Sequence, residues 1–123
     1  MITQSIQMFS KDEEEMVRIL QKAGMQQHIA KTLVYLLHVP GATSREMERG
    51  ADMRQSEVSI AVRELTDQGF VTCEQEQSER KGRPLHRYSL TMPPAAVVDA
   101  LEAKKKEELQ LVVGKIRRLK KMA

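Results

Sequence analysis

Two predicted helices separated by a short turn in the middle of the chain constrain the fold most. Thr43 and Glu46 have the spacing of a capping box, in which each side chain bonds the backbone N–H of the other residue, and they predict a short helix over residues 44–50. A longer helix is expected over residues 55–68, because its apolar residues recur at the spacing of one helix face. These residues are Val58, Ala61, Val62 and Leu65. Two helices joined by a tight, Gly-containing turn predict a helix-turn-helix.

Two further helices are predicted before this pair. Ser10 and Glu13 form another capping box, and the apolar face that follows predicts a helix over residues 11–23, ended by Gly24. The next helix, over residues 26–38, is apolar around much of its circumference. Such a pattern is typical of a central helix that is buried on most sides.

The hydrophobic period changes after the second helix of the pair. Residues 70–73 and 86–90 are rich in β-prone side chains, and the segment between them, residues 75–84, is polar and charged with turn residues near its end. This pattern predicts a β-hairpin with a long basic tip. A hairpin that directly follows a helix-turn-helix predicts the wing of a winged helix-turn-helix.

A long helix is expected at the C-terminal end of the sequence. It begins at Pro93-Pro94 and can run to about Met122. The sequence therefore predicts a mostly α fold with a small β-hairpin. We expect a winged helix-turn-helix domain with its N-terminal helix over residues 1–92, and a C-terminal dimerisation helix over residues 93–123.

Two motifs in this order resemble those of winged-helix transcriptional regulators, in particular the TrmB-like and MarR/ArsR-like groups. The first is residues 54–65, RQSEVSIAVREL, followed by QGFV over residues 68–71. The second is residues 80–90, RKGRPLHRYSL, in which Gly-Arg-Pro precedes a Tyr-x-Leu strand. The resemblance covers about residues 26–90 and implies a regulator that binds double-stranded DNA, with helix 55–68 in the major groove and the wing along the backbone or in the minor groove. Val62 stands where the family often has Leu.

The residues at the start of the second helix are the candidates for base contacts. In a helix-turn-helix these residues approach the base edges, where Arg pairs with guanine and Gln with adenine. The candidates are Arg54, Gln55, Ser56, Ser59 and Arg63. Thr43 and Ser44 could hold a phosphate at the start of the shorter helix. The alternative is that these side chains only cap and solvate the two helix ends.

The predicted wing carries the candidates for contacts to the DNA backbone. They are Arg80, Lys81, Gly82, Arg83 and Arg87, within a wing that spans about residues 75–87. Residues 1–79 contain 8 Lys and Arg against 13 Asp and Glu, whereas residues 80–123 contain 12 against 4. A basic second half on an acidic first half indicates a directed contact with a polyanion. A solvated charged loop is the alternative.

The last helix carries an apolar seam that predicts a homodimer. Its residues recur at spacings of 3, 4 and 3, as in a short heptad pattern: Leu109, Val112, Ile116 and Leu119. We expect Leu101 of the same helix, and Met16 and Leu20 of the first helix, to lie alongside in the interface. A helix folded back on its own domain is the alternative. The basic residues between 115 and 121 are expected on the exposed face.

No motif in the sequence indicates catalysis, a cofactor or a metal. The three histidines, His28, His38 and His86, lie far apart, and the single cysteine, Cys73, is expected to be a small buried hydrophobe. We therefore expect a protein that is not an enzyme. The sequence also shows neither the pattern of a secretory signal nor an apolar run of membrane-spanning length, so we expect a cytoplasmic protein.

Two other functions are compatible with these patterns. Winged helices also serve as protein–protein interaction modules of the transcription machinery, and the acidic balance of residues 1–79 gives this reading some weight. MarR-like repressors respond to small molecules that bind between the domain and the dimer helices, and the sequence does not identify such an effector.

Overall fold

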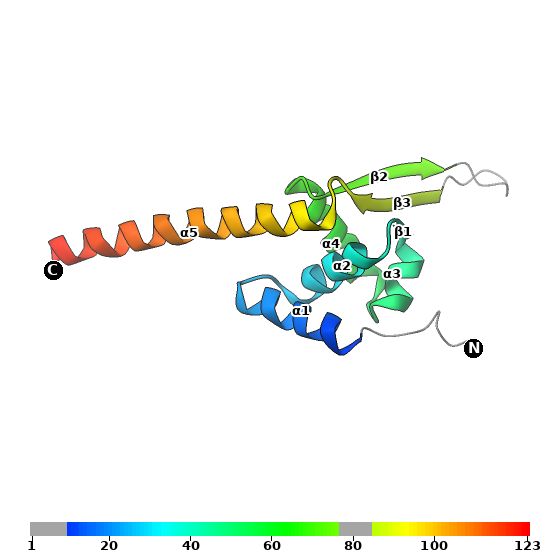
Figure 1. Cartoon of the computed structure of the whole chain (residues 1–123), viewed down its shortest axis with the longest axis horizontal. Helices are drawn as coiled ribbons and strands as arrows, with labels where there is room; N and C mark the ends of the chain where they lie inside the picture. Colours follow the sequence, from blue (N-terminus) through cyan, green and yellow to red (C-terminus); the bar gives the residue numbers. More distant parts are fainter. Residues whose placement is uncertain (1–9, 77–84) are drawn as a thin grey trace. The chain divides into compact units, whose positions relative to one another are not determined.

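The computed structural model describes residues 10–76 and 85–123 of the chain. The chain divides into two compact units, Met1–Thr91 and Met92–Ala123, each of which is described by itself. The first unit contains four helices and three short strands within its described residues (Figure 1). In chain order they are α1 (Lys11–Lys22), α2 (Gln27–His38), β1 (Ala42–Thr43), α3 (Ser44–Gly50), α4 (Gln55–Asp67), β2 (Val71–Glu76) and β3 (Leu85–Leu90). The second unit is the single helix α5 (Pro94–Met122).

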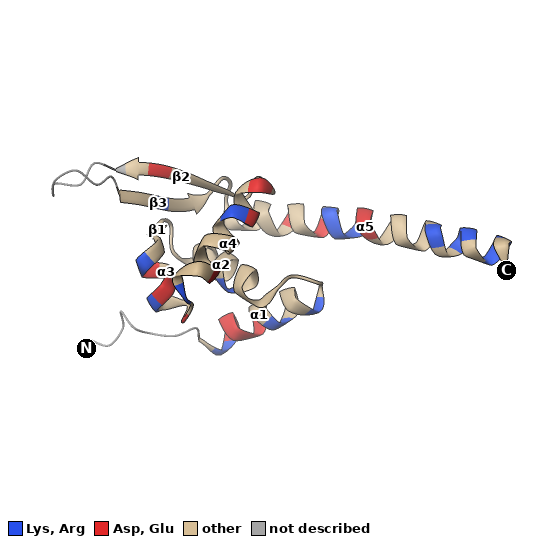
Figure 2. Cartoon of the chain, turned by 180° about the vertical axis from the view of Figure 1, so that it is seen from behind, with Lys and Arg blue, Asp and Glu red and all other residues tan. Residues whose placement is uncertain are grey.

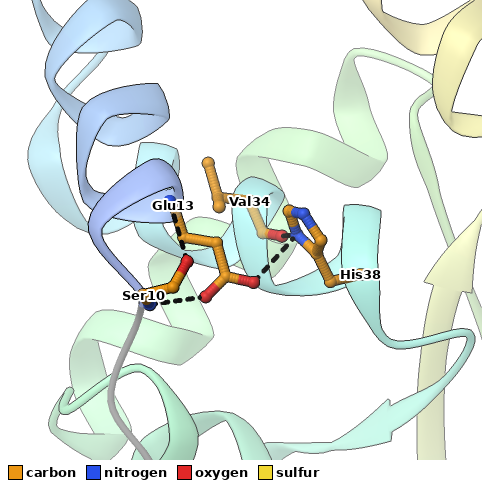
Figure 3. Close-up of polar contacts among 4 residues, drawn as sticks. All are labelled: Ser10, Glu13, Val34 and His38. Atoms are coloured by element: carbon orange, nitrogen blue, oxygen red, sulfur yellow. Dashed lines mark hydrogen bonds and ion pairs between the residues drawn. The ribbon is translucent and has the colours of Figure 1, made fainter.

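The start of α1 has the predicted capping box. Ser10 Oγ accepts a hydrogen bond from the Glu13 N–H at 3.2 Å, and Glu13 Oε1 accepts one from the Ser10 N–H at 2.9 Å. The second carboxylate oxygen of Glu13 lies 3.4 Å from Nδ1 of His38, at the end of α2 (Figure 3). The same Nδ1 lies 2.9 Å from the carbonyl oxygen of Val34, which can only accept, so this bond requires the proton on Nδ1. One carboxylate thus links the start of α1 to the end of α2.

The core is built around α2, as its apolar circumference predicted. Its buried residues are Ile29, Ala30, Thr32, Leu33, Val34 and Leu36. Val17 of α1 packs with Ala30 and Val34, and Met16, Leu20 and Met25 lie partly buried against this cluster. The amphipathic face of α1 is therefore used to cover one side of α2.

The helix-turn-helix consists of α3 and α4, close to the predicted bounds. Thr43 Oγ1 accepts from the Glu46 N–H and Glu46 Oε1 accepts from the Thr43 N–H, so the predicted capping box of α3 is confirmed. The turn differs from the prediction, because Gly50 is still helical and the left-handed residue is Asp52, with φ 54°. Aspartate tolerates this region better than most residues because its short polar side chain can hydrogen-bond locally.

The strands form one antiparallel sheet in the order β1-β3-β2. The hairpin β2–β3 is longer than predicted, since its register runs from Val71 opposite Leu90 to Glu76 opposite Leu85. Strand β1 was not predicted. Only two residues form it, Ala42 and Thr43, which pair with Tyr88 and Arg87 and so join the start of α3 to the hairpin.

The base of the hairpin is fixed to the end of α4. Gly69 has φ +86°, the left-handed conformation that commonly ends a helix, and Phe70 and Val71 directly after it are buried. Thr91, just after β3, donates from its N–H to the Phe70 carbonyl at 2.9 Å and from its hydroxyl to the Gly69 carbonyl at 2.7 Å. These contacts set where both wing strands leave the helix.

Helix α5 has 29 residues, close to the predicted length, and an α-helix of that size is about 43 Å long. Pro94 stands at its first position, where the missing N–H would have no intrahelical partner. Val97 is its one buried residue. Within the described residues, no helix combines the length and apolar character needed to cross a membrane.

Candidate nucleic-acid interface

Helix α4 has one buried and one exposed face. Val58, Ala61 and Leu65 are fully buried, and they hold the helix against the core. The predicted contact residues Gln55, Ser56, Ser59 and Arg63 are all exposed on the other side. The structure thus brings four of the predicted base-contact residues onto one accessible helix surface.

Arg54 precedes this surface as the N-terminal cap of α4. Its backbone N–H donates to Oε1 of Glu57 at 3.0 Å, so the backbone of Arg54 is committed to starting the helix. Arg54 is nevertheless exposed to solvent. The capping explanation therefore accounts for the Arg54 main chain and for Glu57, and it leaves open the use of the guanidinium.

Thr43 and Ser44 lie at the start of α3. The Thr43 hydroxyl oxygen accepts from the Glu46 N–H at 3.2 Å, and the Thr43 N–H donates to Glu46 at 3.0 Å. Both residues are half-buried. Capping explains the polar groups of Thr43, so a phosphate contact from this pair remains a prediction.

Arg87 is the one predicted wing cation within the described residues, because Arg80, Lys81, Gly82 and Arg83 lie outside them. Its Nη1 lies 3.5 Å from Oε1 of Glu46 on α3, and its side chain is about one-third exposed. On the strand it pairs with Thr43 on one side and Glu74 on the other. Arg87 therefore contributes to joining β3 to the helix-turn-helix.

A shallow hollow of about 460 Å³ lies between α4 and the hairpin. It is lined by Ser59, Ile60, Val62, Arg63, Thr66, Asp67, Cys73 and Tyr88. The prediction that Cys73 is buried was wrong, because its side chain is exposed. Burial along β2 ends at Val71, and the residues that follow, Thr72 to Gln75, extend beyond the cover of the core.

Tyr88 of β3 lines the hollow on the side of the hairpin. Burial raises the pKa of the Tyr88 hydroxyl, and the neighbouring Cys73 raises this pKa further. A hydrogen bond with Ser44 opposes these effects on the pKa. Tyr88 therefore remains protonated over the neutral pH range and offers a neutral hydroxyl.

The exposed residue that sequence reasoning missed is Ile60. It lies in the middle of the outward face of α4, and 55% of its surface is exposed. The helical period did place it off the buried stripe of Val58, Ala61 and Leu65. An apolar residue at a position that the period assigns to solvent is a signal that could have identified it.

The predicted seam of α5 is exposed along its whole length. Leu109, Val112, Ile116 and Leu119 are each more than half exposed, and Leu101 is half-buried. Lys105 makes a 3.0 Å ion pair with Glu108. Lysine and arginine gather near the C-terminal end of the helix (Figure 2). The other two predicted interface residues, Met16 and Leu20, pack against the α1–α2 cluster.

The described ranges 10–76 and 85–123 contain no group of three or more His, Cys, Asp or Glu that could hold a metal ion. His38 contacts Glu13, and Nε2 of His86 lies 3.4 Å from Nε2 of Gln75. These two histidines therefore have local partners on neighbouring elements.

No protein-family model matches the chain, and no curated protein matches its sequence. Solved structures do match. TrmBL2, an archaeal chromatin protein, has a TM-score of 0.66 at 17% identity, over 89% of this chain and 39% of that one. A MarR-family regulator from Neisseria meningitidis has a TM-score of 0.54 at 16% identity, over 83% and 70% of the two chains. A transcriptional regulator homologue from Pyrococcus horikoshii OT3 has a TM-score of 0.52 at 15% identity, over 85% and 97%.

These similarities establish the fold. The chain has the winged helix-turn-helix fold that TrmBL2 and MarR-family regulators share, and the fold predicted from the sequence is confirmed. The matched region spans well under half the length of TrmBL2.

Proposed function

We propose that this chain is a transcription regulator that binds double-stranded DNA in a sequence-specific manner as a homodimer. The observation that carries the proposal is the amphipathic character of α4. Its apolar face is buried in the core, and its other face exposes Gln55, Ser56, Ser59 and Arg63. The fold supports it as well, because the structure of TrmBL2 shows a mode of DNA binding and the other similar structures are transcription regulators.

In this proposal α4 enters the major groove. Arginine makes two parallel hydrogen bonds to guanine, and glutamine can do the same with adenine. Arg54, Gln55 and Arg63 are the residues of α4 and its cap that can make such contacts. Ser56 and Ser59 have short side chains, which allow the helix backbone to approach the DNA closely. The exposed face of the first three turns of the helix therefore reads the sequence.

The hairpin lies along the DNA backbone or in the minor groove. Narrow minor grooves attract arginine in particular, and phosphates attract any cation. We assign these contacts to Arg80, Lys81, Gly82 and Arg83, and a phosphate contact to Thr43 and Ser44. Arg87 contributes to holding the hairpin in position through Glu46, at 3.5 Å, and adds positive charge in the middle of β3.

The two subunits associate through α5. Leu109, Val112, Ile116 and Leu119 supply an exposed apolar seam with the spacing of a coiled coil. In this proposal Leu101 extends the seam, and Met16 and Leu20 of α1 are assigned to the same interface. A two-fold axis then requires an inverted-repeat site whose half-site centres are separated by about 34 Å, one helical turn of DNA, or by a multiple of it.

Selection of bound fragments from a random duplex library tests the proposal. We expect the full chain to enrich an inverted repeat, with an affinity that falls steeply as salt rises. The double variant Gln55→Ala, Arg63→Ala should keep the circular-dichroism spectrum of the native chain and lose the enriched motif. Binding of duplex DNA only at very low salt, with no enriched sequence, would contradict the proposal and favour a protein-interaction module.

A further inference from the structure

The outward face of α4 is polar except at its centre. Ile60 is 55% exposed there, although isoleucine is normally among the most buried residues. Residues 43–69 are all described, and within this stretch no other large hydrophobic side chain is exposed. Ser56 lies one turn before Ile60 and Arg63 one turn after it, so the three share one face of the helix.

The polar groups around Ile60 show what it can contact. Ser59, Arg63 and Thr66 line the same hollow as Ile60. The nearest acidic residue in the next turn, Glu64, accepts a hydrogen bond from Nε2 of Gln68 at 2.7 Å and is thereby held along the helix. A partner that fits this surface offers one small apolar group surrounded by hydrogen-bonding groups.

A protein partner does not fit this description. Protein interfaces bury about 800 Å² on each partner around a core of several apolar residues, and exposed patches that mark such sites extend over several hundred Å². Ile60 is the one large hydrophobic side chain that is exposed between residues 43 and 69, and the hollow that it lines with Val62, Cys73 and Tyr88 also contains Ser59, Arg63, Thr66 and Asp67. The major groove of DNA fits better, because its donors and acceptors are interrupted by one apolar group, the C5-methyl of thymine.

We propose that Ile60 packs against the methyl group of a thymine and so selects an A·T pair at one position of each half-site. This inference rests on the proposed function and adds a specificity-determining residue to it. The thymine lies between the contacts made by Ser56 and Arg63, since Ile60 lies between these residues on the helix face.

The experiment uses the full chain and a duplex enriched by selection. Each thymine is replaced in turn by deoxyuridine, which pairs identically and lacks the methyl group. We expect one replacement per half-site to weaken binding of the native chain about fourfold, the effect of one buried CH₂-sized group. The same replacement should not change the Kd of Ile60→Ala. Synthetic duplexes contain no methylated cytosine, so the effect comes from thymine.

Ile19 provides a matched control. It is also 55% exposed, but it lies on α1, so Ile19→Ala should keep the native dependence on the thymine methyl. Circular dichroism checks that both variants fold. An equal loss in the native chain and in Ile60→Ala, or no loss at any thymine, overturns this inference and leaves the proposed function standing. If no duplex is enriched at all, the proposed function fails and this inference fails with it.

Discussion

Gly50, the last residue of α3, lies directly against the ring of Tyr35 on α2. A Cβ at position 50 would overlap Cε1 of Tyr35, and it would lie 2.9 Å from Cζ and 3.0 Å from the hydroxyl oxygen. Gly50 is buried, so the new atom could not turn toward solvent. The absence of a side chain at this position lets the helix-turn-helix pack closely on the central helix.

We therefore expect Gly50→Ala to destabilise the fold by about 1–3 kcal/mol, the usual cost of adding a methyl group to a well-packed core. The substitution raises intrinsic helix propensity, so any loss of stability comes from the clash with Tyr35. Urea unfolding followed by circular dichroism measures the change.

Gly114→Ala is the matched control. Gly114 lies inside α5, and a Cβ added there would meet no atom within 4 Å, so the same substitution should leave α5 unstrained and raise its helical stability by up to about 1 kcal/mol. If Gly50→Ala proves as stable as the native chain, the close approach of Tyr35 is not a packing constraint.

Both tyrosines of the chain, Tyr35 and Tyr88, have hydroxyls whose pKa is raised, mainly by burial. The negative charge of Glu46 also raises the pKa of Tyr35. Their protons are therefore held more tightly in the folded chain than in the unfolded chain. The resulting stability is fully present below the unfolded pKa of about 10 and is lost as pH rises through the folded values.

This pH dependence can be measured with little interference, since the chain contains no tryptophan. We expect the ultraviolet titration of the phenolates to occur at higher pH in the folded chain than in urea. The free energy of unfolding should fall as pH rises above about 10, and the free energy of unfolding of Tyr35→Phe should fall less steeply. Coincident titrations in the folded and unfolded states would contradict the raised pKa values.

Patterns that involve one element could be predicted from the sequence. The capping boxes at Ser10 and Thr43 each depend on two residues three apart, and both form with the predicted partners. The buried stripe of α4 depends on helical period alone, and it too is confirmed. The winged helix-turn-helix follows from the order of such elements.

Features that depend on contacts between distant segments could not be predicted. Strand β1 has two residues, too few for a period, and exists because Ala42 and Thr43 meet β3. The exposure of Cys73 depends on how far the core covers β2, which the local sequence does not determine. Gly50 ends α3 as predicted, but the close approach of Tyr35, fifteen residues away, could not be predicted from the local sequence. Among the site residues, the helical period predicts that Ile60 faces solvent. That an apolar side chain at this position is unusual becomes clear only by comparison with the polar residues around it in the structure.

Base readout by α4 predicts separate effects at separate positions. We expect Gln55→Ala and Arg63→Ala each to relax the preference at one base position and to reduce discrimination there by about 1–3 kcal/mol. Selection from a random duplex library with each variant gives the position. Gln21→Ala, which removes an exposed glutamine from α1, should enrich the native motif unchanged. An unchanged motif with Gln55→Ala and Arg63→Ala would exclude base contacts by these two side chains.

Contacts of the wing with phosphates predict a different signature. Arg83→Ala should weaken binding to all sequences alike and reduce the slope of log K against log salt by about 1, because one fewer counterion is released. Fluorescence anisotropy at several salt concentrations measures this slope. Arg18→Ala is the control, since Arg18 pairs with Glu15 on α1 and should not affect it. A slope that Arg83→Ala leaves unaltered would place the wing away from the DNA.

Association through α5 predicts that one charge in the seam separates the subunits. In Ile116→Asp a carboxylate would be buried without a partner, which costs about 3 kcal/mol or more, so the dimer Kd should rise by at least about a hundredfold. Sedimentation equilibrium should then give the mass of one chain, and affinity for the inverted repeat should fall with it. Gln110→Asp carries the same charge on the same helix away from the seam, and it should remain a dimer. If Ile116→Asp retains the dimer mass, the subunits associate through another surface.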